Sequence, residues 1–318
     1  MAFITRRLLM AVPVLLLVTI IVFSLLHLLP GDPATVILGQ EATQEAIDAM
    51  RLELGLNKPL TIQYFDWLGK ILQGDFGRSL IDRTPVSKLI LQRLPATMEL
   101  TLGAFLVAVF IAFPAGILSA IRPGKWIDHF CTALALGGLS IPHFWLGMIF
   151  IIIFAVNLGW LPASGYVPFS QDPLANLSAM IMPMVATGLR ESAVLMRMLR
   201  SSLLEVVEAD YIRTAYSKGL SERSVIVGHA LRNAMVPVLT TSGLVIASLL
   251  GGLVITETIF SIPGYGKLIV ESIFNRDFVT VQGALLVSAV FVVFINLLVD
   301  ILYTFIDPRI TLGKEADE

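Results

Sequence analysis

The chain has 318 residues, of which 56% are hydrophobic and only 14% are charged, and its mean hydropathy is +0.83. Soluble domains average about 25% charged residues, so this composition excludes a water-soluble globular protein and a disordered chain. The formal net charge of −2 excludes a strongly basic nucleic-acid-binding protein, and the single cysteine, Cys131, permits no intrachain disulfide. The remaining class is a membrane protein that crosses the bilayer several times.

Six apolar stretches are long enough to cross a bilayer as helices. The first runs from Leu8 to Leu29, which exceeds the apolar core of a secretory signal, and no small-residue cleavage site follows it, so we expect an uncleaved span. Pro142 and Pro183 fall inside the third and fourth stretches, where a neighbouring helix can satisfy the freed carbonyl groups. The six predicted spans are about 8–29, 97–121, 130–156, 174–196, 234–256 and 281–306. The predicted fold class is therefore an all-α polytopic membrane protein with both termini on one side.

The distribution of Lys and Arg predicts the orientation of these spans. With the N-terminus inside, the inner segments carry twelve such residues, six of them within 197–233. The short outer segments, 157–173 and 257–280, carry only Lys267 and Arg276, and segment 30–96 is too long to be counted. We therefore expect both the N-terminus and the C-terminus inside.

The outer segment 30–96 contains residues that typically begin and end short helices, which predicts a small helical cap. Thr43 is a plausible N-cap for a helix over 44–54 that Gly55 ends, and Pro59 can open a second helix that reaches about Gln73. A turn is expected at 74–77, and Thr84-Pro85 are expected to start a third helix. The alternative is a loop without a specific role.

The inner segment 197–233 predicts a helix, a glycine and a second helix. Helix-forming residues dominate up to Lys218, Gly219 is a good residue to end the helix, and Ser221 can cap the next one. Such a helix would offer the apolar surface of Tyr211, Ile212, Ala215 and Tyr216, which needs a groove in a partner. The alternative is a solvated connector between two spans.

The sequence lacks the strong catalytic signatures. It has no phosphate-binding loop, no H-E-x-x-H or G-x-S-x-G motif, and its four histidines have no spacing typical of a metal site. Asp300 is the acidic residue that lies deep in a predicted span, and Asn296 lies four residues before it on the same helix face. These two residues either line a polar passage or bond to neighbouring helices. Arg190 and Glu191 lie in the fourth predicted span, where the nearby Arg197 and Arg200 place them near its inner end.

Several short motifs, spread in a fixed order over nearly the whole sequence, make the chain similar to a known family. Examples are Leu-Pro-Gly-Asp-Pro at 29–33, Gly-Asp-Phe-Gly-Arg-Ser at 74–79 and His-Ala-Leu-Arg-Asn-Ala at 229–234. The others lie at 54–60, 93–100, 210–215, 218–220, 257–260, 263–264 and 307–309. With them the chain resembles the permease subunits of bacterial ABC importers of the dipeptide, oligopeptide and nickel class, which have the type I importer fold and lie in the inner membrane.

The resemblance implies that a cytoplasmic loop with an E-A-A-x-x-x-G pattern couples the permease to an ATPase subunit. Gly219 takes the place of the glycine, and Arg213-Thr214-Ala215 stand where Glu-Ala-Ala would be, a form typical of the peptide-importer branch. The implied ATPase-coupling residues are Tyr211, Ile212, Arg213, Thr214, Ala215, Lys218 and Gly219.

The resemblance also implies an organisation and a set of partners. The implied parts are 1–29, a periplasmic cap 30–96, a core 97–306 with the coupling loop 197–233, and a cytoplasmic tail 307–318. The implied partners are a second homologous permease, one or two ATPase subunits, and a substrate-binding protein, together with the lipid bilayer. ATP and Mg²⁺ would be held by the ATPase subunits, with no metal or cofactor bound by this chain.

Two other functions are weighed against a permease driven by ATP. A self-sufficient channel or secondary carrier predicts internal repeats or several intramembrane charges, neither of which is evident in the sequence. An intramembrane enzyme would have almost no residues with which to carry out a reaction. The sequence does not specify which peptide, nickel complex or related solute is carried.

Overall fold

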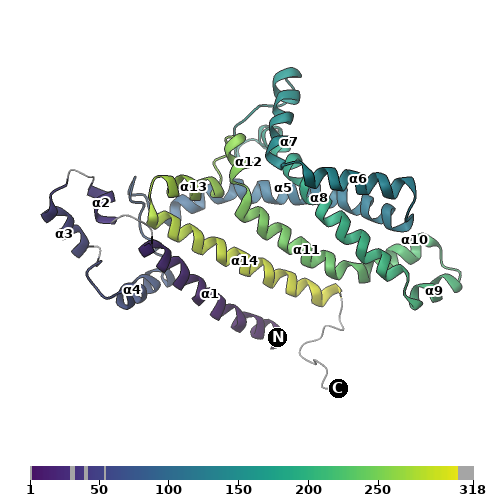
Figure 1. Ribbon diagram of the computed structural model, residues 1–318, viewed down its shortest axis with the longest axis horizontal. Coiled ribbons are helices and arrows are strands. Elements are labelled where there is room, and N and C mark those ends of the chain that lie inside the picture. Colours follow the sequence, from purple (N-terminus) through teal and green to yellow (C-terminus); the bar gives the residue numbers. More distant parts are fainter. Residues whose placement is uncertain (1, 29–32, 39–41, 54, 307–318) are drawn as a thin grey trace. The chain divides into compact units, whose positions relative to one another are not determined.

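The computed structural model describes residues 2–28, 33–38, 42–53 and 55–306, and these residues are mostly helical (Figure 1). The expected tail 307–318, the motif at 307–309 and most of the motif at 29–33 lie outside the described residues. The elements are α1 (Ala2–Leu28), α2 (Pro33–Leu38), α3 (Gln44–Glu53), α4 (Leu60–Leu72), α5 (Val86–Ile121), α6 (Trp126–Ser140), α7 (His143–Phe150), η1 (Ile151–Asn157), α8 (Pro173–Val207), α9 (Asp210–Ser217), α10 (Glu222–Val225), η2 (Ile226–Ala230), α11 (Leu231–Gly252), α12 (Val254–Ile259), α13 (Tyr265–Phe274) and α14 (Phe278–Ile306). Both η1 and η2 are π-helical.

The described part of the chain contains five helices that are long and apolar enough to cross a membrane, or six spans if one bent pair is counted. These are α1, α5, α8, the continuous run from α10 to α11, and α14. The bent pair is α6 with α7 and η1, whose two arms meet at 94°. Each apolar stretch predicted from the sequence overlaps one of these spans, which confirms the helical membrane-protein class. The fifth stretch, 234–256, runs past the end of α11 at Gly252 into α12, and the first ends at Leu29, which lies outside the described residues.

The third predicted span is a broken helix rather than a straight one. Ile141 has extended backbone angles (φ −93°, ψ 124°), and Pro142 is the residue that precedes α7. A residue before proline is driven out of the helical region by contact with the proline ring, so the helix ends here. Figure 1 shows α7 turned away from the axis of α6. Pro183, by contrast, lies inside the uninterrupted α8.

The chain divides into two compact units. Among the described residues, unit 1 contains 2–4, 96–262 and 294–306, and unit 2 contains 263–293 and the described residues between 5 and 95. The expected cap 30–96 therefore falls almost wholly in unit 2, in which α1, α13 and the first half of α14 also lie.

In segment 30–96 the helices and the turn begin and end close to the residues predicted from the sequence. The Thr43 hydroxyl accepts a hydrogen bond from the Ala46 N–H (3.4 Å) at the start of α3, and Gly55 has a φ of +71° just beyond it. Pro59 precedes α4, and Asp75 accepts a bond from the Gly77 N–H (2.9 Å) in the expected turn. The third expected helix does begin after Pro85, but it is the start of the 36-residue α5 rather than a separate element.

Unit 2 is held together by a buried carboxylate. Asp277 accepts hydrogen bonds from the Ser79 hydroxyl (2.5 Å), the Leu80 N–H (3.1 Å) and the Thr280 hydroxyl (2.7 Å). It therefore both caps α14 and anchors the loop before α5. Beside it, Val86, Ile90, Tyr265, Leu268 and Ala284 form a small apolar cluster.

Unit 1 is built around α8. Its side chains pack against α6, α7 and α11, and two glycines allow a close approach to α5. A Cβ on Gly188 would lie 2.6 Å from the backbone oxygen of Ala104, and one on Gly103 would lie 2.3 Å from the Met184 sulfur. Small residues at such crossings let helix backbones pack closely in a membrane, where van der Waals contact drives association.

Candidate coupling and translocation site

The predicted helix–glycine–helix loop is present at one end of α8 and α11 (Figure 1). α9 ends at Ser217, and Gly219 has a φ of +80°, the left-handed conformation that favours glycine. Ser221 then accepts a hydrogen bond from the Ser224 N–H (3.4 Å) and caps α10, as expected. The helix predicted to continue from 197 to Lys218 instead breaks at Glu208 and Ala209, so that α9 is a separate element of eight residues.

The residues of α9 divide between a buried and an exposed face. Ile212 is fully buried and Ala215 is 8% exposed, whereas Tyr211 and Tyr216 are 44% and 41% exposed. The sequence-based expectation that these four residues form one exposed apolar surface is therefore wrong for Ile212 and Ala215. Their spacing of three residues places both on the side that faces the protein core. The other residues named for this site, Arg213, Thr214, Lys218 and Gly219, are exposed.

The buried face of α9 joins a cluster that contains the ends of several helices. We call this the basal cluster; its buried members are Ala120, Leu199, Leu203, Ile212, Ala215, Val225, Ile226, Ala230, Ala234 and Val238. They come from α5, α8, α9, α10, η2 and α11. In addition, the Tyr211 hydroxyl accepts a hydrogen bond from Asn233 Nδ2 (2.6 Å). α9 is thus fixed to the helices that lead into the apolar core.

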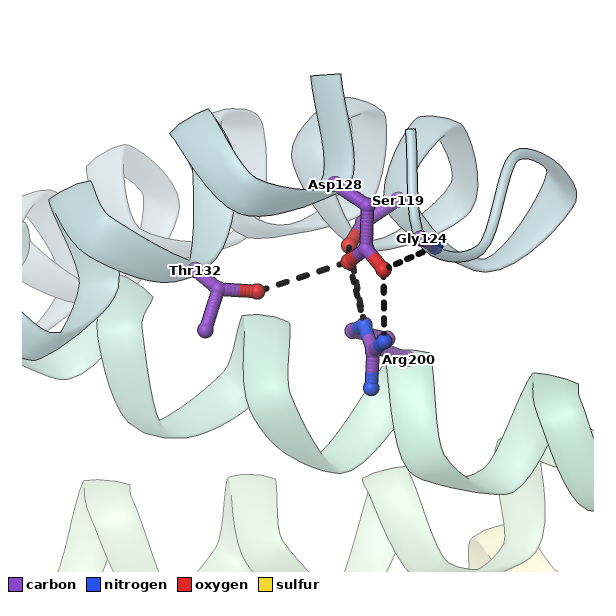
Figure 2. A network of polar contacts seen from close by, with 5 residues as sticks. All are labelled: Ser119, Gly124, Asp128, Thr132 and Arg200. Carbon is purple, nitrogen blue, oxygen red and sulfur yellow. Dashed lines mark hydrogen bonds and ion pairs between the residues drawn. The ribbon is translucent and has the colours of Figure 1, made fainter. Parts of the chain in front are cut away.

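A buried ion pair lies close to the basal cluster (Figure 2). Arg200 of α8 donates from Nε to Asp128 Oδ1 and from Nη2 to Asp128 Oδ2, both at 2.7 Å. Asp128 of α6 also accepts hydrogen bonds from the Ser119 hydroxyl and from the Gly124 N–H (2.9 Å), and Thr132 lies 3.4 Å away. The carboxylate therefore ties the α5–α6 turn to the lower part of α8. Sequence reasoning missed this pair, although an acid at the edge of an apolar run was a signal for it.

A second buried acid lies in the motif at 257–260. Glu257 of α12 is fully buried and accepts a hydrogen bond from the Thr97 hydroxyl (2.5 Å) on α5. Phe260 of the same motif packs against Gly147, and its carbonyl accepts a bond from the Gly165 N–H (2.9 Å). These contacts fix α12 and the loop after η1 to the core of unit 1.

The loop between η1 and α8 is held by another polar cluster. Asn176 Nδ2 donates hydrogen bonds to Glu99 Oε2 (2.9 Å) and to the Val167 carbonyl (2.7 Å). Burial, together with the nearby Glu99 carboxylate, raises the pKa of Tyr166 to about 12, so its hydroxyl stays protonated at neutral pH.

The two residues suggested as pathway lining lie on one side of α14. Asn296 is exposed and Asp300 is partly buried. Near them, the Thr240 and Tyr303 hydroxyl groups share a hydrogen bond between α11 and α14. Another polar pair lies in α8, where Arg190 Nη1 is 3.0 Å from Oε1 of the buried Glu191. Among the described residues, no group of three or more His, Cys, Asp or Glu side chains is placed to hold a metal ion.

Comparison with known proteins gives consistent matches over the whole chain. Residues 112–312 match the family described as binding-protein-dependent transport system inner membrane component, and residues 1–101 match the N-terminal region of such components. The chain is 43% identical over 312 residues to the oligopeptide transport system permease protein AppB of Bacillus subtilis, covering 97% of this chain and 99% of that protein. It is 41% identical over 331 residues to the di/tripeptide transport system permease protein DppB of Pseudomonas aeruginosa, covering 98% of each.

The fold is also similar to that of a solved transporter. A structure of the MetNI methionine ABC transporter in inward-facing conformations matches with a TM-score of 0.55 at 18% identity, covering 69% of this chain and 96% of that one. This likeness shows a shared fold, which is that of a type I ABC importer permease. With the family match over more than half of its length, the chain belongs to the binding-protein-dependent transport system inner membrane components, the multi-pass permease subunits of ABC importers.

Proposed function

We propose that this chain forms half of a translocation pathway for peptides and that separate ATPase subunits drive it through α9. The peptide substrate is supported by the names of the relatives, which are oligopeptide and di/tripeptide permeases. ATP and Mg²⁺ are assigned to the ATPase subunits, because the sequence has no phosphate-binding loop. A second, homologous permease chain completes the pathway, and a soluble binding protein delivers the substrate on the outer side.

The observation that carries this proposal is the division of α9 into two faces. The helix leaves two tyrosine rings exposed, while Ile212 and Ala215 fix it to the basal cluster. Tyrosine is enriched among residues that dominate protein–protein affinity. We infer that Tyr211, Thr214, Tyr216 and Lys218 contact the ATPase, and that Ile212 and Ala215 act indirectly by holding α9 in place.

The predicted orientation is consistent with this assignment. With both termini inside, α9 lies on the cytoplasmic side, where ATP is available. The loop at 158–172 and the buried Asp277 cluster then lie on the outer side. We infer that the binding protein docks on that side, against segment 30–96 and the 257–267 region.

The experiment is affinity purification of the tagged chain from mild detergent, followed by mass spectrometry of the proteins recovered with it. A second six-span permease and one or two ATPases with Walker motifs are expected. The variant Tyr211→Ala/Tyr216→Ala should lower ATPase recovery about tenfold or more while the second permease is retained, since each ring is a candidate anchor. The control Phe169→Ala removes an exposed ring from the distant 158–172 loop and should change neither.

Two results would contradict the proposal. One is full ATPase recovery with the double tyrosine variant, which would place the coupling surface elsewhere. The other is purification of the chain alone in a form that moves solute in liposomes, which would support a self-sufficient carrier.

A further inference from the structure

The exposed residues of α8 are apolar in its first half and mostly polar or charged in its second half, and the two sets lie on different sides of the helix. In the first half the exposed large side chains are Leu174, Leu177 and Ile181. In the second half the exposed positions are Arg190, Arg197, Ser201 and Glu205, with Val194 half-buried among them. At about 100° per residue, each set occupies one narrow face, and the two faces are about half a turn apart. We call the second set the polar stripe.

The two faces suit different surroundings. Leucine and isoleucine can face lipid at no cost. An arginine that faces hydrocarbon is strongly disfavoured, so intramembrane charges face protein or a water-filled cavity. The other sides of this part of α8 are buried or partly buried against its own chain. Arg197, Ser201 and Glu205 lie beyond the predicted span 174–196, in the inner segment, so Arg190 is the charge of the polar stripe that lies within the span and requires water or a partner.

Arg190 is the first residue of the polar stripe, and its side chain is positioned by an ion pair with Glu191. Its guanidinium is 3.0 Å from Glu191 Oε1, and the Glu191 side chain is only 7% exposed, whereas that of Arg190 is 44% exposed. A guanidinium carries five N–H donors in a planar fork, and the bond to Glu191 uses one of them. The exposed part of the fork is therefore positioned for a second planar acceptor.

We propose that the polar stripe lines the inner part of the translocation pathway and that Arg190 binds the terminal carboxylate of the transported peptide there. This inference rests on the peptide substrate proposed above. A carboxylate is the acceptor that the fork of an arginine fits best. Glu191 offsets part of the positive charge, so that the bound carboxylate can leave again, as conduction through a pathway requires.

The first test asks whether the polar stripe faces water. In a Cys131→Ala background, single variants Val194→Cys, Arg197→Cys and Ser201→Cys are compared with Leu177→Cys and Ile181→Cys on the other face. The assembled complex is treated with a charged, membrane-impermeant thiol reagent. The three stripe positions should be labelled at least severalfold more than the two controls. Arg197 and Ser201 lie beyond the predicted span 174–196, so Val194→Cys is the decisive variant. Labelling of Val194→Cys no greater than that of the two controls would overturn the proposal.

The second test concerns the ligand. The complete complex in proteoliposomes is given alanine peptides of two to five residues, and the same peptides as C-terminal amides. Arg190→Gln should lower uptake of the free acids about tenfold, the effect of losing a charge-assisted hydrogen bond, and change uptake of the amides less than twofold. Arg190→Lys should recover part of the loss. The same binding protein is used with every permease variant, so its own preference for free acids or amides affects all variants equally.

The outcomes separate this inference from the proposed function. If the wild-type complex assembles and takes up peptides but Arg190→Gln affects acids and amides equally, or neither, only the role of Arg190 is wrong. If the wild-type complex takes up neither form, the peptide substrate is wrong as well. Arg122→Gln, an exposed arginine in the α5–α6 turn, is the control for a general loss of charge.

Discussion

Removing Arg200 should destabilise the permease by stranding the Asp128 carboxylate. The side chain of Asp128 is 4% exposed and that of Arg200 is 30% exposed, and two hydrogen bonds of 2.7 Å join them. Loss of one partner of a buried ion pair typically costs about 3–5 kcal/mol. Because Arg200 keeps some access to water, and Ser119 and Gly124 still donate to the carboxylate, we expect about 2–3 kcal/mol for Arg200→Met.

The assay is the thermal midpoint of the purified chain in detergent, followed by size-exclusion chromatography after heating. A loss of 2–3 kcal/mol corresponds to a fall of about 3–5 °C for a chain of this size. The double variant Asp128→Leu/Arg200→Met removes both charges and should return close to the wild-type midpoint, since apolar replacements of buried pairs are often neutral. A double variant as unstable as Arg200→Met would refute the reasoning, because the loss would then come from packing rather than from a stranded charge.

Two further substitutions test the packing of each unit. Gly188→Ala would place a methyl group 2.6 Å from the Ala104 carbonyl oxygen and should sharply lower the amount of folded protein in the membrane. The control Gly137→Ala adds a methyl group that meets nothing within 4 Å and should leave that amount unchanged. Equal amounts of folded protein for the two variants would contradict the tight α5–α8 crossing. Asp277→Ala removes the acceptor of Ser79, Leu80 and Thr280 and should cost about 2–3 kcal/mol locally, seen as faster proteolysis of the 74–85 loop. Unchanged cleavage would show that this loop is held by its apolar contacts.

Much of the fold could be predicted because the signals are local. Long apolar runs indicate spans, and turn residues such as Gly55, Gly219 and Ser221 mark the ends of helices regardless of tertiary packing. The break in the helix at Pro142 was harder to predict from the sequence. Proline inside a membrane helix can either be tolerated, as at Pro183, or end the helix, as at Pro142. The outcome depends on the neighbouring helices, which the local sequence does not specify.

The candidate site was harder to predict because it depends on pairings across long sequence separations. Asp128 and Arg200 are 72 residues apart, and Thr97 and Glu257 are 160 apart. Arg200 entered the sequence analysis only as one of the charges that set the orientation. The sequence does not show whether Ile212 of α9 faces a partner or its own core, since both environments bury it.

The burial of Ile212 also changes how α9 would act on the pathway in the proposed function. A helix that offered its whole apolar face to a partner would be loosely attached to its own chain. Here Ile212 and Ala215 pack with Leu199 and Leu203 of α8, so α9 is joined to the lower end of that helix. Arg190 lies in the same uninterrupted helix, 17 residues before its end at Val207, or about 26 Å at 1.5 Å per residue. A displacement of α9 by an ATPase would therefore pass to α8 through the packing of Ile212 and Ala215, across the break at Glu208 and Ala209, and would then reach the proposed carboxylate site along one uninterrupted helix.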